Sequence, residues 1–215
     1  MTVDRIDRTD TDRRGRLDPA DLAPTWDAQL AGWLADAEGA GLPQPNAMVL
    51  ATVDLEGSPS TRSVLCKAID GRGIVFYTNY TSAKSRDLRS NQRASVTFPW
   101  YGLERQAHLK GRVERLGREE TAAYWATRPR GSQLGAWASP QSVVLSSRQV
   151  LEDSLAAIRQ RFADAETVPL PPHWGGWLMH PDRVEFWQGR PDRMHDRLAY
   201  DQLPDQRWVI HRLGP

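Results

Sequence analysis

A row of charged side chains near the C-terminus could bind an anion, because Arg193, His195 and Arg197 are spaced two residues apart. In an extended segment the side-chain period is two, so all three would lie on one face. Two guanidinium groups and an imidazole placed in this way repel one another unless an anionic or electron-rich group lies among them. Trp187 would add an aromatic ring beside the row. The alternative is a solvated edge strand whose charges discourage pairing with another chain.

Two earlier segments also present cations where a bound anion would explain them. Arg62 and Lys67 lie five apart in a predicted strand over 60–70, on opposite faces, which indicates either a bulge or two different anions. Lys84 lies in the first turn of a short helix that Thr81 or Ser82 can cap. A cation is disfavoured there by the helix macrodipole, and a bound phosphate would remove the conflict.

A third segment combines three kinds of phosphate-binding side chain. In a predicted helix over 119–128, Tyr124 and Arg128 are four apart and share one face, and Ser132 follows in a predicted loop. A phenol, a guanidinium and a hydroxyl at a helix end are suited to holding a phosphate, since arginine offers two parallel donors. The alternative is an ordinary surface helix followed by a turn.

Neutral hydrogen-bonding groups mark two further positions. Gln106 opens a predicted strand over 106–116, and Gln141 and Ser142 end the turn-rich segment LGAWASPQS. An amide can both donate to and accept from a heterocycle, although the pattern alone does not show that it does so.

The remaining pattern predicts the elements that position these side chains. Residues 1–20 are charged and aperiodic and are expected to form a mobile arm. An amphipathic helix is predicted over 23–40 and another over 146–163, the latter as a packing element. Strands are predicted over 47–54, 60–70 and 74–79 as an antiparallel meander, and over 94–100, 106–116, 174–179, 184–187 and 208–213.

Length and composition exclude several classes of protein. The 215 residues suit one domain, and the formal net charge of +1 gives no overall basic field for nucleic acid. No apolar run has membrane-spanning length, and the N-terminus is too polar for a signal peptide. Cys66 is the only cysteine, which excludes internal disulfides and fits a reducing cytoplasm. The five histidines show no close pairing, so no metal site is expected.

Several blocks of sequence, in order from about Leu22 to Pro215, resemble the pyridoxamine 5'-phosphate oxidase family. They are PNAMVLATVD, RSVLCK, FYTNYTSAK, FPWYGLERQ, RPRGSQLGAWASPQS, PPHWGGW, EFWQGR and RMHDR. The resemblance implies an α+β, mainly antiparallel fold: an FMN-binding split β-barrel with peripheral helices, formed by residues 21–215. It also implies a cytoplasmic homodimer with FMN at the subunit interface.

The resemblance also implies roles for individual residues. Matching positions contact FMN at Arg62, Ser63, Val64, Leu65, Cys66, Lys67, Tyr77, Thr78, Lys84, Gln106, Gln141, Ser142, Trp187 and Arg197. Matching positions bind the vitamin B6 substrate at Lys67, Tyr124, Arg128, Ser132, Arg193, Met194 and His195. With Arg62 and Lys67 serving different phosphates, their placement on opposite strand faces is explained.

The implied reaction oxidises pyridoxamine or pyridoxine 5'-phosphate to pyridoxal 5'-phosphate. A hydride passes from the C4' carbon to the flavin, and dioxygen reoxidises the flavin to give hydrogen peroxide. Arg193 is expected to align the substrate and supply electrostatic stabilisation. His195 is expected to support it or relay a proton.

The chain departs from the family pattern at four places. The arm contains Arg13 and Arg14 but lacks the tyrosine that usually helps to close over the substrate. Ala83 stands where many relatives have a second arginine at the FMN phosphate, which is expected to weaken flavin retention. Gln44 replaces a common acidic residue, and Cys66 replaces a usual leucine.

Three other functions fit the same residues less well. A phenazine-tailoring flavin oxidase of this fold would not need the phosphate-binding set of Lys67, Tyr124, Arg128 and Ser132. A deazaflavin-dependent reductase would leave the RMHDR block without a role. A non-catalytic protein that binds flavin or pyridoxal phosphate is separated from the enzyme only by a turnover assay.

Overall fold

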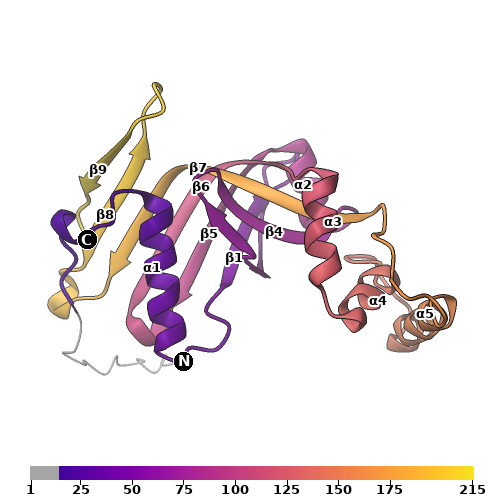
Figure 1. Ribbon diagram of the computed structural model, residues 1–215. Helices are drawn as coiled ribbons and strands as arrows, with labels where there is room; N and C mark the ends of the chain where they lie inside the picture. Colours follow the sequence, from indigo (N-terminus) through magenta and orange to yellow (C-terminus); the bar gives the residue numbers. More distant parts are fainter. Residues whose placement is uncertain (1–14) are drawn as a thin grey trace, which may run out of the picture. The chain divides into compact units, whose positions relative to one another are not determined.

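A computed structural model of the chain describes residues 15–215 as a mixed α+β fold built on antiparallel strand pairs (Figure 1). The predicted first helix is confirmed as α1 (Trp26–Gly39). It begins at Thr25, whose side chain accepts a hydrogen bond from the Ala28 N–H at 3.4 Å. Its buried face includes Trp26, Leu30 and Trp33, in agreement with the apolar periodicity. No helix within residues 15–215 is long and apolar enough to cross a membrane.

Nine strands form one sheet in the part of the chain that is described. The order is β2-β1-β5-β6-β7-β4-β3, with β8 paired to β7 and β9 paired to β8. The strands are β1 (Ala47–Val53), β2 (Pro59–Leu65), β3 (Ala68–Asp70), β4 (Gly73–Asn79), β5 (Arg93–Trp100), β6 (Arg105–Arg115), β7 (Trp174–Gln188), β8 (Asp196–Gln202) and β9 (Trp208–Arg212). The pairs β1–β2, β3–β4, β4–β7, β7–β8 and β8–β9 are antiparallel.

The prediction of one strand over 60–70 is wrong, because the chain changes partner at Cys66. Up to Leu65 it pairs with β1, and the Cys66 N–H still donates to the Asn46 carbonyl at 2.9 Å. The next N–H, that of Lys67, donates instead to the Val75 carbonyl at 2.8 Å, and β3 then pairs with β4. Arg62 therefore lies within β2, and Lys67 lies in the short link between two strands.

The final part of the sheet also differs from the prediction. Residues 174–179 and 184–187 belong to one long strand, β7, and β8 was not predicted as a strand. The register of β7 and β8 pairs Trp187 with Arg197 and Phe186 with Leu198.

The chain in the described range divides into two compact units. The strands β5, β6 and β7 each begin in one unit and end in the other. Unit 1 contains the residues up to Pro45, 97–109 and 182–215, and unit 2 contains 46–96 and 110–181.

The core of unit 1 is a set of aromatic rings between α1 and the strands. Phe186 packs edge-on against Trp33 at 5.0 Å and against Tyr200 at 5.8 Å between ring centroids. The Tyr200 hydroxyl donates to the Ala23 carbonyl at 2.6 Å, just before α1. Edge-to-face rings of this kind stabilise a core beyond the area they bury.

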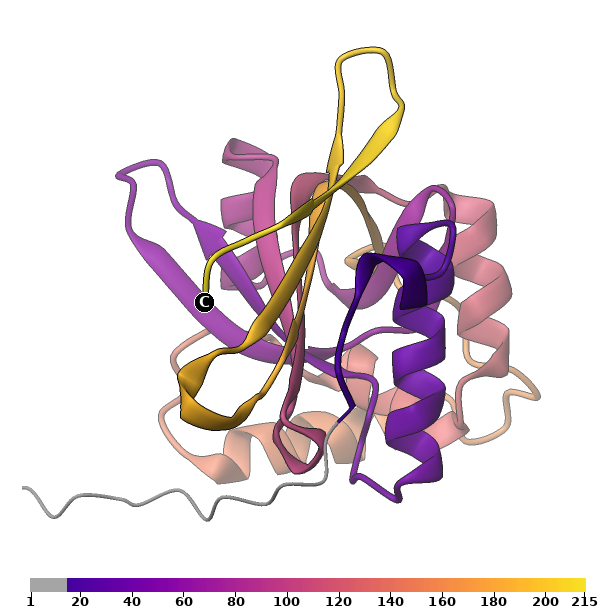
Figure 2. The ribbon, with the colours of Figure 1, turned by 90° about the vertical axis from the view of Figure 1, so that its left-hand side faces the viewer.

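The start of the described chain lies along the β8–β9 hairpin of the same unit (Figure 2). Leu17 is buried, and its N–H donates to Asp196 Oδ2 at 3.1 Å while its carbonyl accepts from Arg212 Nη2 at 3.1 Å. A short 3-10 helix, η1 (Pro19–Asp21), follows. Most of the predicted mobile arm, residues 1–14, lies outside the described residues. The predicted single domain over 21–215 stays a prediction.

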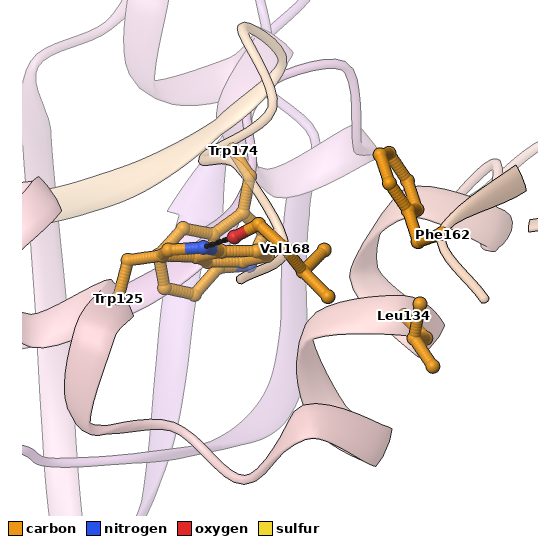
Figure 3. Close-up of a cluster of buried hydrophobic side chains, with 5 residues drawn as sticks. All are labelled: Trp125, Leu134, Phe162, Val168 and Trp174. Atoms are coloured by element: carbon orange, nitrogen blue, oxygen red, sulfur yellow. Dashed lines mark hydrogen bonds between the residues drawn. The ribbon is translucent and has the colours of Figure 1, made fainter. Parts of the chain in front are cut away.

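Unit 2 contains four helices and a second buried core. They are α2 (Ala83–Ser90), α3 (Arg118–Thr127), α4 (Arg130–Ala138) and α5 (Arg148–Arg161), and three of them lie close together (α3, α4 and α5 in Figure 1). A buried cluster of Trp125, Leu134, Phe162, Val168 and Trp174 joins α3 and α4 to the chain beyond α5 (Figure 3). The α5 helix itself has no fully buried residue and contacts this cluster through Leu155 and Ile158.

Candidate active site

Most of the predicted site residues line a cavity of about 470 Å³ in unit 2. These are Ser63, Val64, Leu65, Lys67, Tyr77, Thr78, Lys84, Tyr124, Arg128, Ser132 and Gln141. They come from β2, the link after it, β4, α2, α3, α4 and the segment after α4. Segments that are far apart in sequence therefore line one cavity. Its cations, Lys67, Lys84 and Arg128, come from different segments.

One group of cavity residues gathers at the N-terminus of α2. Lys84 Nζ donates to Thr78 Oγ1 at 3.3 Å, and Thr78 Oγ1 in turn donates to Gln141 Oε1 at 3.1 Å. The Ala83 N–H, at the first helical position, donates to Ser142 Oγ at 3.1 Å. Residues from β4, α2 and the segment after α4 are thus held together by hydroxyl and amide groups. This is the donor-rich arrangement that suits a phosphate at a helix N-terminus.

Arg62 lies near Lys84 but does not line the cavity. Its Nη1 donates to Thr52 Oγ1 at 2.6 Å, and its Nη2 lies 3.7 Å from Asp87 Oδ2. Burial lowers the pKa of Arg62, and the charge of Asp87 opposes the shift. Burial also lowers the pKa of Lys84, repulsion from Arg62 adds to the effect, and Asp87 again opposes it. Arg62 and Lys84 thus share the single carboxylate of Asp87, so the positive charge at this place is not fully balanced.

A second group of cavity residues is aromatic and basic. The rings of Tyr77 and Tyr124 are stacked with centroids 3.9 Å apart, and Trp174 stacks on Tyr77 at 5.3 Å. The Arg128 guanidinium lies over the Trp174 ring, with its central carbon 4.4 Å from the ring centroid. Burial lowers the pKa of Arg128, opposed by Tyr124. The Arg128 Nη1 atom is buried without a hydrogen-bond partner, the one side-chain atom of this kind among residues 15–215.

The position of Ser132 differs from the prediction. It was expected in a loop, but RPRGSQ turns at Pro129 and enters α4, so Ser132 lies in the first turn of that helix. Pro129 is the N-cap, and the Ser132 N–H donates to its carbonyl at 2.8 Å. Ser132 is exposed and lines the cavity, and its role at a phosphate stays a prediction.

Three other predicted residues lie in a separate cavity of about 300 Å³ in unit 1. Gln106 from β6, Trp187 from β7 and Arg197 from β8 line it. Arg197 Nε donates to Glu185 Oε1 at 2.7 Å, and this hydrogen bond raises the pKa of Arg197. Its Nη1 donates to the Gly214 carbonyl at 2.9 Å, which fixes the C-terminal residues beside the cavity.

Several lining residues were not predicted. Glu185 lies two residues before Trp187 on the same strand face, so the strand period could have identified it. His108 lies two residues after Gln106 and follows the same rule. Trp174 in the first cavity gave no such signal, because a tryptophan beside glycines is typical of a core position.

The predicted row of Arg193, His195 and Arg197 is wrong as a continuous extended segment. Residues Pro191–Arg193 form a 3-10 turn, η3, in which Asp192 and Arg193 have φ of 54° and 59°. Two successive left-handed residues interrupt the strand period, and β8 begins only at Asp196. His195 keeps a place near the second cavity, since its ring centroid lies 4.7 Å from that of Trp187. Arg193 and Met194 are exposed.

Two predicted residues have mainly structural surroundings. Cys66 is buried, and burial raises the pKa of its thiol to about 12, so it is an unreactive thiol. Ser142 does not line the cavity, and its hydroxyl accepts a hydrogen bond from the Ala83 N–H at the start of α2. No group of three or more histidine, cysteine, aspartate or glutamate side chains that could hold a metal ion occurs within residues 15–215.

The geometry therefore suits anionic ligands that carry flat aromatic groups. The first cavity has one cationic, donor-rich place at α2 and another at Arg128, with aromatic rings beside it. The second cavity adds a guanidinium, an amide and an indole.

Comparison with known proteins identifies the same family over nearly the whole chain. The profile described as pyridoxamine 5'-phosphate oxidase matches residues 34–162, and the one described as the pyridoxine 5'-phosphate oxidase C-terminal dimerisation region matches residues 174–215. The chain is 58% identical over 202 residues to a pyridoxine/pyridoxamine 5'-phosphate oxidase from Saccharopolyspora erythraea, covering 94% of this chain and 90% of the relative.

Two solved structures are similar in fold. PhzG from Burkholderia lata in complex with tetrahydrophenazine-1-carboxylic acid is 31% identical, with a TM-score of 0.86 over 94% of this chain and 99% of that one. A pyridoxamine 5'-phosphate oxidase-related, FMN binding protein from Nostoc punctiforme is 18% identical, with a TM-score of 0.72 over 91% of this chain and 99% of that one. At that identity the second likeness concerns the fold alone.

The crowding of cations at α2 predicts a stability change with a defined pH dependence. Protonated Lys84 is less favourable in the folded protein than in the unfolded chain. At pH values below the lowered pKa, its charge therefore reduces the free energy of unfolding. The penalty disappears as the pH rises through that pKa towards the ordinary value of 10.5. Without added anions, Lys84→Met should therefore be more stable than wild type near neutral pH, and the difference should shrink in alkaline solution.

Urea unfolding followed by tryptophan fluorescence over a pH series measures this difference. Lys110→Met, at an exposed lysine of β6, is the control and should show no such trend. A Lys84→Met protein less stable than wild type near neutral pH would show that its charge is compensated within the chain.

Proposed function

Because the chain belongs to the pyridoxamine 5'-phosphate oxidase family, we propose that it oxidises pyridoxamine 5'-phosphate or pyridoxine 5'-phosphate to pyridoxal 5'-phosphate. The chain is a flavin-dependent oxidoreductase with FMN as its cofactor, and its fold class is the family's split β-barrel with peripheral helices. The observation that carries the proposed substrate is the pair of separate cationic places in one cavity, since FMN and the substrate each bring a phosphate.

The residues at α2 fit the phosphate of FMN. Lys84 is a partly buried cation with a lowered pKa, and Arg62 adds a second positive charge beside it. An anion bound there would relieve the repulsion between them and accept from donors at the helix N-terminus. Lys84, Arg62, Thr78, Gln141 and Ser142 would hold this end of the cofactor. Ala83 adds no further cation, so the site depends on these two.

The second cationic place fits the phosphate of the substrate. Arg128 offers a buried donor atom without a partner, and Lys67, Tyr124 and Ser132 line the same cavity. Charge-assisted hydrogen bonds to a phosphate would satisfy this donor and orient the substrate. When bound, FMN would supply the redox chemistry as the acceptor of a hydride from the substrate's C4' carbon, with dioxygen as the final electron acceptor and hydrogen peroxide as the product.

The chain's own contribution to the reaction is orientation and control of one proton. The Arg190 N–H donates to His195 Nδ1 at 3.1 Å, so the neutral imidazole carries its proton on Nε2. His195 would support Arg193 or relay a proton. Arg193, held in a left-handed conformation next to His195, would align the substrate ring and stabilise developing charge.

We place the cofactor and substrate at the interface of a homodimer. The region similar to the family's dimerisation region, residues 174–215, carries Trp187, Arg193, His195 and Arg197. Gln106, Trp187 and Arg197 line a cavity of unit 1, whereas the phosphate-binding residues line a cavity of unit 2. We propose that the unit 1 cavity of one copy completes the unit 2 cavity of its partner.

We place the activity in the cytoplasm. Cys66 is a free and buried thiol, which is compatible with a reducing compartment. The proposed phosphorylated substrates are also charged molecules that do not cross membranes unaided.

A second candidate function follows from the likeness to PhzG, whose structure contains a tetrahydrophenazine carboxylic acid. This chain would then be a flavin oxidase acting on another aromatic compound. The set of Lys67, Tyr124, Arg128 and Ser132 in one cavity favours a phosphorylated substrate instead, because a phosphate offers more acceptor oxygens to these donors than a carboxylate does. A non-catalytic flavin-binding protein would bind the same ligands without turnover.

Anaerobic mixing of the FMN-loaded protein with pyridoxine 5'-phosphate, and separately with pyridoxamine 5'-phosphate, tests the proposed function. The flavin absorption is expected to bleach, to recover when air is admitted, and to leave pyridoxal 5'-phosphate. Unphosphorylated pyridoxine is the matched control and should bleach the flavin far more slowly. Bound flavin that never bleaches with either phosphate would contradict the proposal.

The role proposed for Arg193 predicts a separation between binding and turnover. Arg193→Ala is expected to retain FMN, because the residue is not among those at the cofactor phosphate, and to lose most of its turnover, by roughly a hundredfold or more. Flavin content and the rate of anaerobic bleaching measure the two effects. Arg207→Ala, at an exposed arginine paired with Asp205 in the β8–β9 turn, is the control. Unchanged bleaching in Arg193→Ala would refute the role.

A further inference from the structure

The guanidinium of Arg128 is held by aromatic rings. Its central carbon lies 4.4 Å from the ring centroid of Trp174 and 5.2 Å from that of Trp125. The two indoles meet at 64° with centroids 5.0 Å apart, and both belong to the buried cluster of unit 2 (Figure 3). Trp125 is fixed in turn by a hydrogen bond from its Nε1 to the Val168 carbonyl at 2.7 Å. Arg128 therefore lies against a rigid aromatic wall.

This mode of holding a cation has a chemical consequence. A carboxylate partner would occupy the N–H donors of the guanidinium and neutralise its charge. An aromatic face attracts the cation through its quadrupole and uses none of those donors. The buried Nη1 of Arg128 has no hydrogen-bond partner. Burial also lowers the pKa of the guanidinium. Arg128 also lines the cavity, so its guanidinium keeps its positive charge beside a space in which an anion can bind.

Trp174 connects this arginine to the tyrosines of the same cavity. It lines the cavity itself and stacks on Tyr77 at 5.3 Å and 11° between ring planes. Tyr77 stacks on Tyr124 at 3.9 Å and 14°. The position of Trp174 is set by its pairing with Asn79 at the start of β7. One indole at a strand end thus contacts both Arg128 and Tyr77.

We propose that Trp174 is a positioning residue that sets the preference for phosphorylated ligands, by holding Arg128 with its donors directed to the ligand's phosphate. The inference rests on the proposed function, because it takes the substrate phosphate to bind at Arg128. Trp174 acts through Arg128 and the tyrosine stack, so its loss should weaken recognition of the phosphate and leave recognition of the pyridine ring unchanged.

Equilibrium binding to the FMN-loaded protein tests this proposal without relying on turnover. The probes are pyridoxal 5'-phosphate and pyridoxal, which differ only in the phosphate. Trp174→Leu is expected to weaken binding of pyridoxal 5'-phosphate by about thirtyfold, the size of a desolvated cation–π contact, and to leave pyridoxal binding unchanged. Trp174→Phe keeps an aromatic face and should restore most of the loss. In turnover by Trp174→Leu, KM for the phosphorylated substrate should rise by the same factor as the loss in affinity, while kcat changes little.

Trp137→Leu is the matched control for loss of an indole from the same region. Trp137 packs against the same buried cluster, donates from its Nε1 to the Pro169 carbonyl at 2.7 Å, and does not line the cavity. It should leave the preference for the phosphorylated probe as in wild type.

The outcomes separate this proposal from the proposed function. A wild-type protein that binds pyridoxal as tightly as pyridoxal 5'-phosphate would overturn the assignment of the substrate phosphate itself. A wild-type preference that survives in Trp174→Leu would overturn the role of Trp174 alone. Equal weakening of both probes in Trp174→Leu, or no rescue by Trp174→Phe, would reduce Trp174 to a structural residue and also overturn the role.

Discussion

The site depends on cations that the fold holds partly out of water without enough negative charge to balance them. Lys84 is repelled by Arg62 as well as desolvated, and Arg128 lies on indole rings with a buried donor atom unpaired. Such groups lower the free energy of unfolding when no ligand is bound. A bound anion removes this destabilisation, and the affinity for the anion is higher as a result. The surrounding structure serves this purpose: Thr52 and Asp87 hold Arg62, while Trp125 and Trp174 hold Arg128.

A second constraint is the division of the site residues between two cavities. The residues of unit 2 are proposed to bind the phosphates, and those of unit 1 offer an amide, an indole and the Arg197–Glu185 ion pair. Neither set alone provides both the phosphate anchors and the groups near the reacting carbon. The C-terminal region, similar to a dimerisation region, carries the second set. Dimerisation and completion of the active site are therefore proposed to be the same event, with two identical sites related by the twofold axis.

Sequence reasoning predicted the elements with a strong local period and the residues with a distinctive chemistry. The amphipathic pattern gave α1, and the i, i+4 spacing placed Tyr124 and Arg128 in one cavity. The predictions were wrong where tertiary contacts determine the backbone conformation. At Cys66 the chain exchanges one strand partner for another, and before His195 a left-handed turn interrupts the apparent period of two. Trp174 was missed for a related reason, because only the folded structure shows that a core indole also faces a cavity.

Complementation between two defective variants tests the shared site most directly. Lys84→Met damages the unit 2 cavity and Arg197→Gln the unit 1 cavity, so each homodimer alone should reduce little flavin with pyridoxine 5'-phosphate. In co-expressed protein, a mixed dimer has one site with both defects and one with none, so about a quarter of wild-type flavin reduction should return. If each site were built within one chain, every site in the mixture would carry a defect. No recovery of activity in verified mixed dimers would contradict the account.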